Sequence, residues 1–387
     1  METDRNIYIL NHTNMKTRRF LTTMLCSLMV GMSFTGCGDE FDKYQEFGPA
    51  PEETAQQRLI YVLNEGLWGA NNANISGFLF NKLENELSSK GDLYLKENQK
   101  QMGDVANDIV EEDDKIYVVL NGSKYVAKLN ARCKEEGRYT FFKDEGAPRC
   151  IDVEDDYAYV TQYGGQVTKL NVKDMTVDDI FYGGDNLEGI VENNGKLYVA
   201  NSYKADGSGN YVYGKEVFVI DTKTMNLEKT INVVDNPTKL YEIDDKIYLI
   251  SQGNYADIAG ALQVINTQNG TSRVIINDVT KITAGHDYLI YGVRATYDSN
   301  WQLSNSFFIY NPKADEVVET PFLKDAPSSF SRDAIYLLEV DEEMGYIYVG
   351  VSDYTTNGTI YQFDKNGKLL RHFDSCGINP SAMIFMD

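Results

Sequence analysis

A strand–turn–strand unit that recurs along the chain is the feature that most restricts how this sequence can fold. Its clearest copy runs from Pro237 to Asn266, where two short runs of β-branched and aromatic residues flank the acidic turn Asp244-Asp245-Lys246 and a loop leads to a third run. The second run recurs seven times, at residues 59–63, 116–119, 157–160, 197–199, 247–249, 288–291 and 347–349. Self-similarity of this kind is typical of a repeat architecture.

The third runs of the unit align as well, and each ends in Asn or Asp, which favours a turn into a fourth strand. They lie at residues 124–130, 166–171, 216–221, 261–266, 306–311 and 359–364. The repeat fills residues 58–387 at about 47 residues per copy, close to the period of a propeller blade. The sequence therefore predicts one all-β domain, a seven-bladed β-propeller.

The two ends of the repeat predict how the ring closes. The first marker strand, Leu59 to Leu63, has no first strand ahead of it, whereas the segment from Gly377 to Met386 resembles the other first strands and has no second strand after it. An open array would leave sheet edges unpaired. We therefore expect the last strand to pair with Leu59–Leu63 as a C-terminal strand clasp.

The amino terminus has the pattern of a processing signal. Lys16, Arg18 and Arg19 precede an apolar run over 20–34, and Phe34-Thr-Gly-Cys37 follows. This predicts a signal peptide over 1–36 that starts at Met15, and a flexible tether over 37–57. The ending resembles a bacterial lipobox, which implies lipidation of Cys37. The alternative is a secreted protein with an incidental cysteine.

The acidic cluster Gly38 to Asp42 resembles the signal that sends lipoproteins of Bacteroidota to the outer face of the outer membrane. It implies a lipid-anchored protein at the cell surface. A merely polar linker is the alternative.

Charge and composition restrict the function. The formal net charge is −22, which argues against nucleic-acid binding. Only three histidines occur, His12, His286 and His372, so histidine-based catalysis is poorly supplied, and we expect neither an enzyme nor a cofactor or metal. The many acidic side chains leave a calcium-dependent hydrolase or lactonase open. A disulfide between Cys133 and Cys150 is also left open.

Long connections on one face of the ring are the predicted binding site, because loops on a rigid scaffold commonly carry function. Irregular loops rich in Asn, Gly, Tyr and Trp are expected at 64–74, 201–215, 252–260 and 294–305. The ligand-binding candidates on this face are Trp68, Asn71, Asn72, Asp104, Asn107, Arg149, Tyr163, Glu188, Asn201, Tyr203, Asn254, Tyr255, Arg294, Tyr297, Arg332 and Tyr354. For Trp68, packing between blades is the competing interpretation.

The run Asn64-Glu-Gly-Leu-Trp-Gly-Ala-Asn-Asn-Ala-Asn-Ile-Ser76 resembles the signature that opens the surface propeller lipoproteins of Bacteroidota, relatives of the YncE-type propellers. That group includes the BtuG-type lipoproteins. The resemblance implies capture of vitamin B12 (cobalamin or another corrinoid) at the cell surface and its delivery to a TonB-dependent outer-membrane transporter. A glycan or protein ligand, or a metal-assisted lactonase activity, remains the alternative.

The chemistry of a corrinoid suits the predicted face. Cobalamin is a broad amphipathic disc with an amide fringe, so aromatic side chains and the amides of Asn71, Asn72, Asn201 and Asn254 would contact it. Its phosphate would meet Arg149, Arg294 or Arg332.

Overall fold

The structure is a computed structural model that describes residues 57–386, apart from 143–144, 209, 286–287 and 320. The predicted signal peptide, Cys37 and the acidic cluster lie outside the described residues. The predicted tether ends at residue 57, yet Gln57 already begins the first strand. Over the described part of the chain, no helix is both long and apolar enough to cross a membrane.

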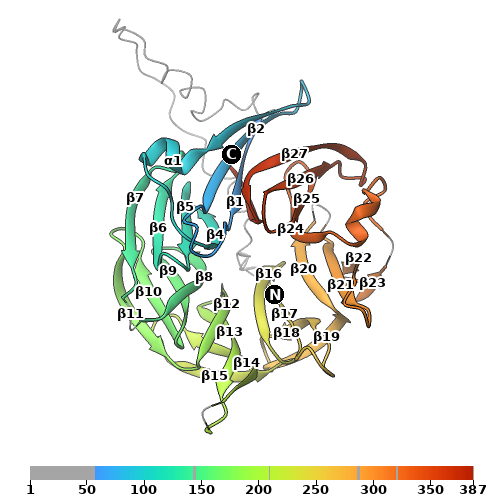
Figure 1. The fold of residues 1–387 in the computed structure, drawn as a ribbon. Coiled ribbons are helices and arrows are strands. Elements are labelled where there is room, and N and C mark those ends of the chain that lie inside the picture. Colours follow the sequence, from blue (N-terminus) through green and yellow to red (C-terminus); the bar gives the residue numbers. More distant parts are fainter. Residues whose placement is uncertain (1–56, 143–144, 209, 286–287, 320, 387) are drawn as a thin grey trace, which may run out of the picture.

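The fold is all-β, with its sheets arranged around a common centre as in a propeller (Figure 1). Five blades of four antiparallel strands are present, and consecutive strands of the chain are neighbours in nearly all of them. The blade that holds both ends of the described chain contains β1 (Gln57–Asn64), β2 (Asn74–Asn81), β3 (Glu86–Asp92) and β28 (Pro380–Met386). The next contains β4 (Ala106–Glu112), β5 (Lys115–Leu120), β6 (Tyr125–Asn130) and β7 (Glu135–Thr140).

The other three four-stranded blades follow later in the chain. They are β16 (Pro237–Ile243), β17 (Lys246–Ser251), β18 (Ala261–Asn266) and β19 (Thr271–Asn277); β20 (Val279–Ala284), β21 (Ile290–Tyr297), β22 (Leu303–Asn311) and β23 (Glu316–Val318); and β24 (Ala334–Val340), β25 (Ile347–Ser352), β26 (Asn357–Phe363) and β27 (Leu369–Ile378). A short helix, α1 (Leu93–Asn98), joins β3 to β4, and a 3-10 turn, η5 (Ser328–Ser331), precedes β24.

The remaining eight strands belong to one sheet. They are β8 (Ala147–Glu154), β9 (Tyr157–Tyr163), β10 (Gln166–Asn171), β11 (Thr176–Tyr182), β12 (Asn186–Asn193), β13 (Lys196–Ala205), β14 (Tyr211–Asp221) and β15 (Leu227–Asn232). A single residue pair, Asn186 with Tyr163, joins its two halves.

The first and last strands lie side by side, where the blue and red ends of the ribbon meet in Figure 1. β1 and β28 are antiparallel, with Leu59 opposite Met386 and Leu63 opposite Ala382. Segments more than 300 residues apart in the chain thus share one sheet, and the inner edge of β1 is covered.

The hydrophobic core lies between neighbouring sheets. The marker tyrosines Tyr61, Tyr248 and Tyr348 are almost fully buried, because each second strand is covered on both faces. One cluster joins Tyr117 and Val119 of β5 to Val160 of β9, and the other clusters repeat this arrangement around the ring. Each blade therefore depends on its neighbours for the burial of its apolar side chains.

Two of the predicted irregular loops are largely strand, which corrects the sequence-based interpretation. β13 continues to Ala205 and β14 begins at Tyr211, while β21 continues to Tyr297. Cross-strand pairs such as Tyr203 opposite Tyr213 fit a pleated surface well and outweigh the nearby Asn and Gly residues.

The three cysteines in the described residues are free thiols, so no disulfide joins Cys133 to Cys150. Cys133 is fully buried in one cluster, whereas Cys150 packs against a different one.

Arg58 ties the beginning of the chain to a segment near its end. Its guanidinium donates two hydrogen bonds of 3.2 Å to Asp341, which follows β24 and has no exposed surface. The guanidinium also lies 2.7 Å from Glu343 and 5.7 Å from the centre of the Phe385 ring on β28.

Replacing Arg58 with Met should lower the free energy of unfolding by about 2–4 kcal/mol, because Asp341 would be left as a buried charge without its counter-ion. The backbone amides of Glu343 and Met344 still donate to Asp341, which limits the loss. Chemical denaturation measures the change. Arg273→Met is the matched control, since the Arg273–Asp315 pair is about half exposed and should contribute less than about 1 kcal/mol. Equal small losses in both variants would contradict the assignment.

Candidate functional site

The strands nearest the ring axis share one irregularity, and it positions the candidate site. In β4, β8, β12, β16, β20, β24 and β28 the pairing register shifts near the start of the strand, which leaves an additional residue there, as in a β-bulge. We call the residues at this position the bulge residues: Asn107, Arg149, Glu188, Thr238, Thr280, Tyr336 and Ser381.

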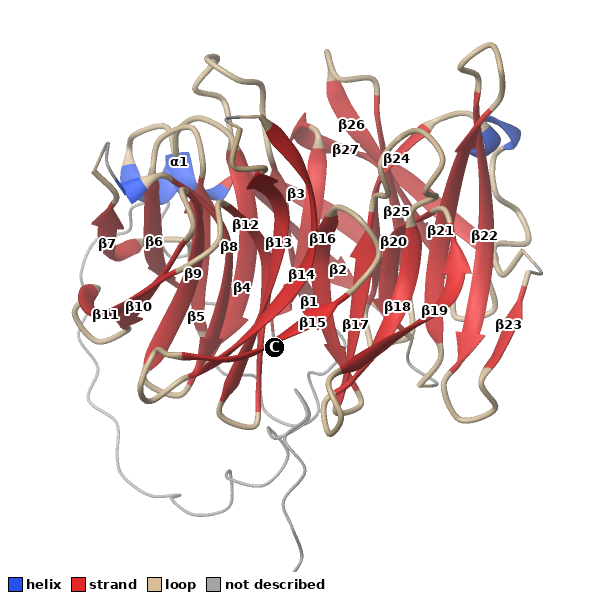
Figure 2. Cartoon of the chain, turned by 90° about the horizontal axis from the view of Figure 1, so that it is seen from below, coloured by secondary structure: helices blue, strands red, loops and turns tan. Residues whose placement is uncertain are grey.

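The bulge residues lie on the side of the ring where these inner strands begin, which we call the loop face. The helices α1 and η5 and the extended hairpin β21–β22 are on this side in the edge-on view of Figure 2. At three bulges the side-chain hydroxyl donates a hydrogen bond to the backbone carbonyl that the bulge leaves without a strand partner. Thr238 donates to the carbonyl of Ile250 at 3.2 Å, Thr280 to that of Val293 at 3.4 Å and Ser381 to that of Leu63 at 3.4 Å.

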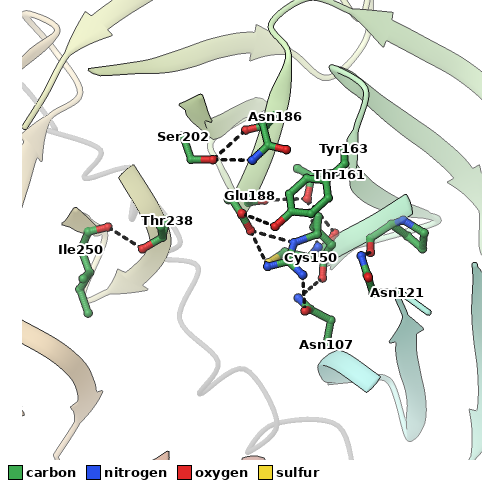
Figure 3. A network of polar contacts seen from close by, with 12 residues as sticks. Asn107, Asn121, Cys150, Thr161, Tyr163, Asn186, Glu188, Ser202, Thr238 and Ile250 are labelled. Carbon is green, nitrogen blue, oxygen red and sulfur yellow. Dashed lines mark hydrogen bonds and ion pairs between the residues drawn. The ribbon is translucent and has the colours of Figure 1, made fainter. Parts of the chain in front are cut away.

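Three consecutive bulge residues form a continuous polar network (Figure 3). Arg149 donates to the Glu188 carboxylate at 2.9 Å and to the Asn107 side-chain oxygen at 2.6 Å. Asn107 in turn donates to the Arg149 carbonyl at 2.6 Å. The Tyr163 hydroxyl donates to the other oxygen of Glu188 at 2.7 Å, and its ring lies 4.5 Å from the Arg149 guanidinium.

Burial sets the electrostatics of this network. Burial by itself would lower the pKa of Arg149, but the Glu188 carboxylate outweighs that effect and raises it, so the guanidinium stays charged. Burial, reinforced by Glu188, raises the pKa of Tyr163, so its hydroxyl keeps its proton. The network is thus a fixed ion pair with a neutral hydroxyl donor. The sequence placed all four residues on this face, and the structure brings them together.

Other groups around the axis escaped the sequence analysis. Tyr336 donates its hydroxyl to Glu65, and Lys281 lies 5.5 Å from the centre of the Tyr336 ring. Lys239 occupies the corresponding position one inner strand earlier. The available signal was a lysine at the third residue of both inner strands, directly after a threonine.

Aromatic side chains gather on the loop face. Within the described residues, every strongly exposed aromatic residue except Tyr288 lies on its loops or hairpins: Trp68, Phe142, Tyr182, Tyr211, Tyr255, Tyr297, Trp301 and Tyr354. Trp68 is 76% and Trp301 80% exposed. The competing interpretation that Trp68 packs between blades is therefore wrong.

A hollow on this face lies beside the β13–β14 hairpin and holds about 580 Å³. Its aromatic wall is Tyr203, Tyr211 and Tyr213, and Tyr203 and Tyr213 have ring centres 4.9 Å apart. Burial raises the pKa of Tyr203 to about 12, with a further contribution from Tyr213. Tyr255 lies against Tyr213 with ring centres 6.0 Å apart. Lys204, Val212, Lys215, Asp235 and Asn254 complete the lining.

Several predicted contact residues instead hold the loops in shape. Asn72, Asp104, Asn201 and Asn254 accept hydrogen bonds from backbone amides at Leu67, Gly69, Asn186 and Ile258. Asn201 is also buried. The side-chain oxygens are therefore used within the protein. The loops that they stabilise carry the exposed aromatic residues.

The remaining candidates differ in their exposure and in the partners that they already have. Arg294 donates to the Asn277 carbonyl and lies 3.1 Å from Glu319, which holds it at the outer part of its blade. Asn71 is exposed and donates to Gln101 at 2.7 Å. Arg332 is exposed, and Tyr354 packs against Tyr336 with ring centres 5.8 Å apart. Tyr297 packs against Trp301.

Among the described residues, no group of three or more His, Cys, Asp or Glu side chains is placed to hold a metal ion.

Comparison with known proteins shows similarity in fold. No family model matches the chain, and no curated protein matches it in sequence. Two similar solved structures are provisionally described as 6-phosphogluconolactonases. The one from Bacteroides fragilis has 14% identity and a TM-score of 0.61 and covers 87% of this chain and 100% of its own. The one from Bacteroides uniformis has 13% identity and a TM-score of 0.59, and covers 86% and 100%.

Hydrazine synthase of Kuenenia stuttgartiensis is also similar, with 19% identity, a TM-score of 0.54, and 67% of this chain and 77% of its own covered. At these identities the similarity concerns the fold alone. It supports the propeller fold predicted from the sequence, and membership of the BtuG-type group stays a prediction.

These similarities correct one prediction. From the shortage of histidines we expected that the chain is not an enzyme, but two of the similar structures are described as lactonases. The shortage of histidines was therefore an insufficient ground for excluding a hydrolase activity.

Replacing Glu188 with Gln should lower the free energy of unfolding by about 2–3 kcal/mol, because Arg149, whose side chain is only 21% exposed, would lose its counter-ion. Glu228→Gln is the matched control: Glu228 pairs with Lys196 at an exposed position, and Lys196 keeps its bond to Asp221. Denaturant unfolding compares the two. If the Glu188 variant were as stable as the control, the ion pair would not organise the axis.

Proposed function

We propose that the loop face binds a broad amphipathic small molecule, and that this ligand is a corrinoid such as cobalamin. The observation that carries the proposal is the concentration of exposed aromatic side chains, both tryptophans included, on this one face. Exposed aromatic patches with polar neighbours mark binding surfaces, since their burial against a ligand is favourable.

We assign the proposed contacts by the exposure of the candidate residues. Trp68, Tyr255 and Tyr297 would cover the apolar faces of the ligand, and the tyrosine-lined hollow beside β13–β14 would receive a ring at its edge. Asn71 is the predicted amide that remains exposed, and Arg332 is an exposed arginine available to a phosphate group. A glycan is the competing ligand for the same surface.

Hydrolysis of a lactone is a second candidate function. It is favoured by the similarity to structures described as 6-phosphogluconolactonases, together with the carboxylate and guanidinium of the axial network. In this function Arg149 would hold a substrate oxyanion and Glu188 would position water or substrate. A lactone-opening assay with native protein and Glu188→Gln tests it.

We also propose that the ring has seven blades and is closed by β28. Two observations support the count and the closure. The halves of the eight-stranded sheet are joined by one residue pair only, and β28 pairs with β1 along most of its length. The Arg58→Met measurement tests this closure, because Arg58 contacts both β28 and the segment after β24.

For location and partners, we propose a lipoprotein anchored through Cys37 to the outer membrane, facing the cell exterior, that passes its ligand to a TonB-dependent transporter. The lipobox-like ending and the acidic residues after it support this proposal. The role of the transporter rests on the corrinoid being the ligand.

Titration with cyanocobalamin should show saturable binding to the purified full chain, and Trp68→Ala should weaken it about tenfold or more, because an aromatic anchor commonly contributes ~2 kcal/mol. Since Trp68 is exposed, the melting temperature of this variant should stay within a degree or two of the native value. Isothermal titration and thermal melts provide both readouts.

Tyr288→Ala is the matched control, since Tyr288 is an exposed aromatic residue away from the loop face and should leave binding unchanged. Absence of cyanocobalamin binding by the native chain would discard the corrinoid, and a glycan array would then test the competing ligand.

Cys37→Ala should abolish acylation, whereas replacing Asp39, Glu40 and Asp42 with Ala should leave the protein acylated but facing the periplasm. Metabolic labelling with a fatty acid and protease treatment of intact cells distinguish the two. If protease still removes the triple variant from intact cells, the acidic residues are not an export signal.

A further inference from the structure

Two lysines occupy the same position on neighbouring inner strands. Lys239 of β16 lies opposite Ile250 and Lys281 of β20 opposite Val293, in each case directly after the bulge. Lys239 is exposed although its strand is the innermost of its blade. Lys281 is half-buried and lies beside the ring of Tyr336.

The two strands that carry these lysines are also the least closely packed neighbours around the axis. β4 with β8, β8 with β12, β12 with β16, β20 with β24 and β24 with β28 all pack closely, whereas β16 and β20 do not. The lysines therefore border the place where the inner wall is most open.

Neither ammonium group has an acceptor among the described residues. No ion pair within 4.0 Å and no hydrogen bond involves the side chain of Lys239 or Lys281, although each ammonium group has three N–H donors to satisfy. Enclosure by the protein, followed by the positive charge of Lys239, lowers the pKa of Lys281 to about 7. The two cations thus repel each other, whereas Glu339 favours the charged form of both, and Tyr241 is the main cause of the raised pKa of Lys239.

The acidic groups nearest to the lysines already have other partners. Glu65 accepts the Tyr336 hydroxyl, Glu339 accepts the Thr283 hydroxyl at 3.2 Å, and Asp108 accepts the backbone amide of Ile151 at 3.0 Å. Glu65 and Glu339 favour the charged form of Lys281, but they do not outweigh enclosure and Lys239. A ligand that brings two negative charges and several acceptor oxygens would complete this arrangement.

We propose that Lys239 and Lys281 form a binding site on the ring axis for a doubly charged tetrahedral oxyanion, the phosphate group of a small molecule or free phosphate. Ammonium groups bind such an anion as point charges, and each of the two would donate at least one charge-assisted hydrogen bond. The site lies one residue further along the inner strands than the bulge residues, and the inference does not rest on the corrinoid being the ligand.

Inorganic phosphate titrated into the purified full chain should bind saturably, and Lys239→Gln/Lys281→Gln should weaken the binding at least about tenfold. Lys281→Met alone keeps the apolar stem and should weaken it several-fold. Circular dichroism checks that each variant is folded, because the raised pKa of Lys239 shows that its charge is stabilised by the groups around it. Lys365→Gln, in an exposed turn after β26, changes the net charge equally and should bind phosphate as the native chain does.

A second series uses sulfate, whose charge is constant through neutral pH. Its affinity should fall as the pH rises above about 7, because Lys281 then loses its proton, and the fall should be absent in Lys281→Met. The groups that face Lys281 are Lys239, Glu339, Glu65 and Tyr336. If the pH dependence of sulfate affinity came from another of these groups, it would persist in Lys281→Met.

Glucose 6-phosphate distinguishes the two sources of the anion. Tighter binding than inorganic phosphate assigns the site to the phosphate end of a larger ligand, and equal binding assigns it to the free anion. The proposal is overturned if phosphate does not bind at up to about 10 mM, or if the double variant, folded by circular dichroism, binds phosphate with native affinity. Loss of cyanocobalamin binding with retained phosphate binding would reject only the function proposed for the loop face.

Discussion

The β-bulge near the start of each inner strand is the constraint on which the site depends. In a regular strand, alternate side chains are buried between the sheets. One additional residue interrupts this alternation, so its side chain points elsewhere, and the interruption occurs at corresponding positions of the inner strands. A polar residue at that position therefore does not have to enter the apolar space between sheets. It can instead form the Asn107–Arg149–Glu188 network or satisfy a carbonyl of its own blade.

The bulge is tolerated because the second strands on both sides are so well buried. Apolar clusters between neighbouring sheets hold each blade by its second and third strands, so the inner strand is free to depart from regular pairing over one or two residues. The same dependence on neighbours makes the junction between the first and last strands important. There the backbone pairing of β1 with β28 is joined by a buried guanidinium, which fixes the geometry with two parallel hydrogen bonds.

Much of the fold followed from pattern alone, because the tyrosine-centred second strands repeat and each copy must bury the same faces. Leu59 to Leu63 and the last ten residues could be matched because each lacked the strand that the other supplied. The features that the sequence pattern did not predict depend on contacts between segments that are distant in the chain. The Asn-rich segments after Asn201 and Arg294 continue as strands because a partner strand pairs with them, as Tyr203 and Tyr213 illustrate. Similarly, an Asn that suggests ligand contact, such as Asn72 or Asn201, is used to hold a loop.

The candidate site divides into two chemical layers that the sequence does not distinguish. On the loop face, the exposed aromatic residues offer area and adaptable contacts, which suit a large ligand of mixed polarity. On the axis, Arg149, Glu188 and Tyr163 are held by one another, so their positions are fixed before any ligand arrives. A ligand with an apolar body and an anionic group would use both layers, because Arg149, Lys239 and Lys281 lie near the start of inner strands, on the face that carries the exposed aromatic residues. Because the chain as a whole is acidic, it repels anions at long range, so with the proposed anion site selection between ligands would rest on the apolar body that brings the anionic group to the axis.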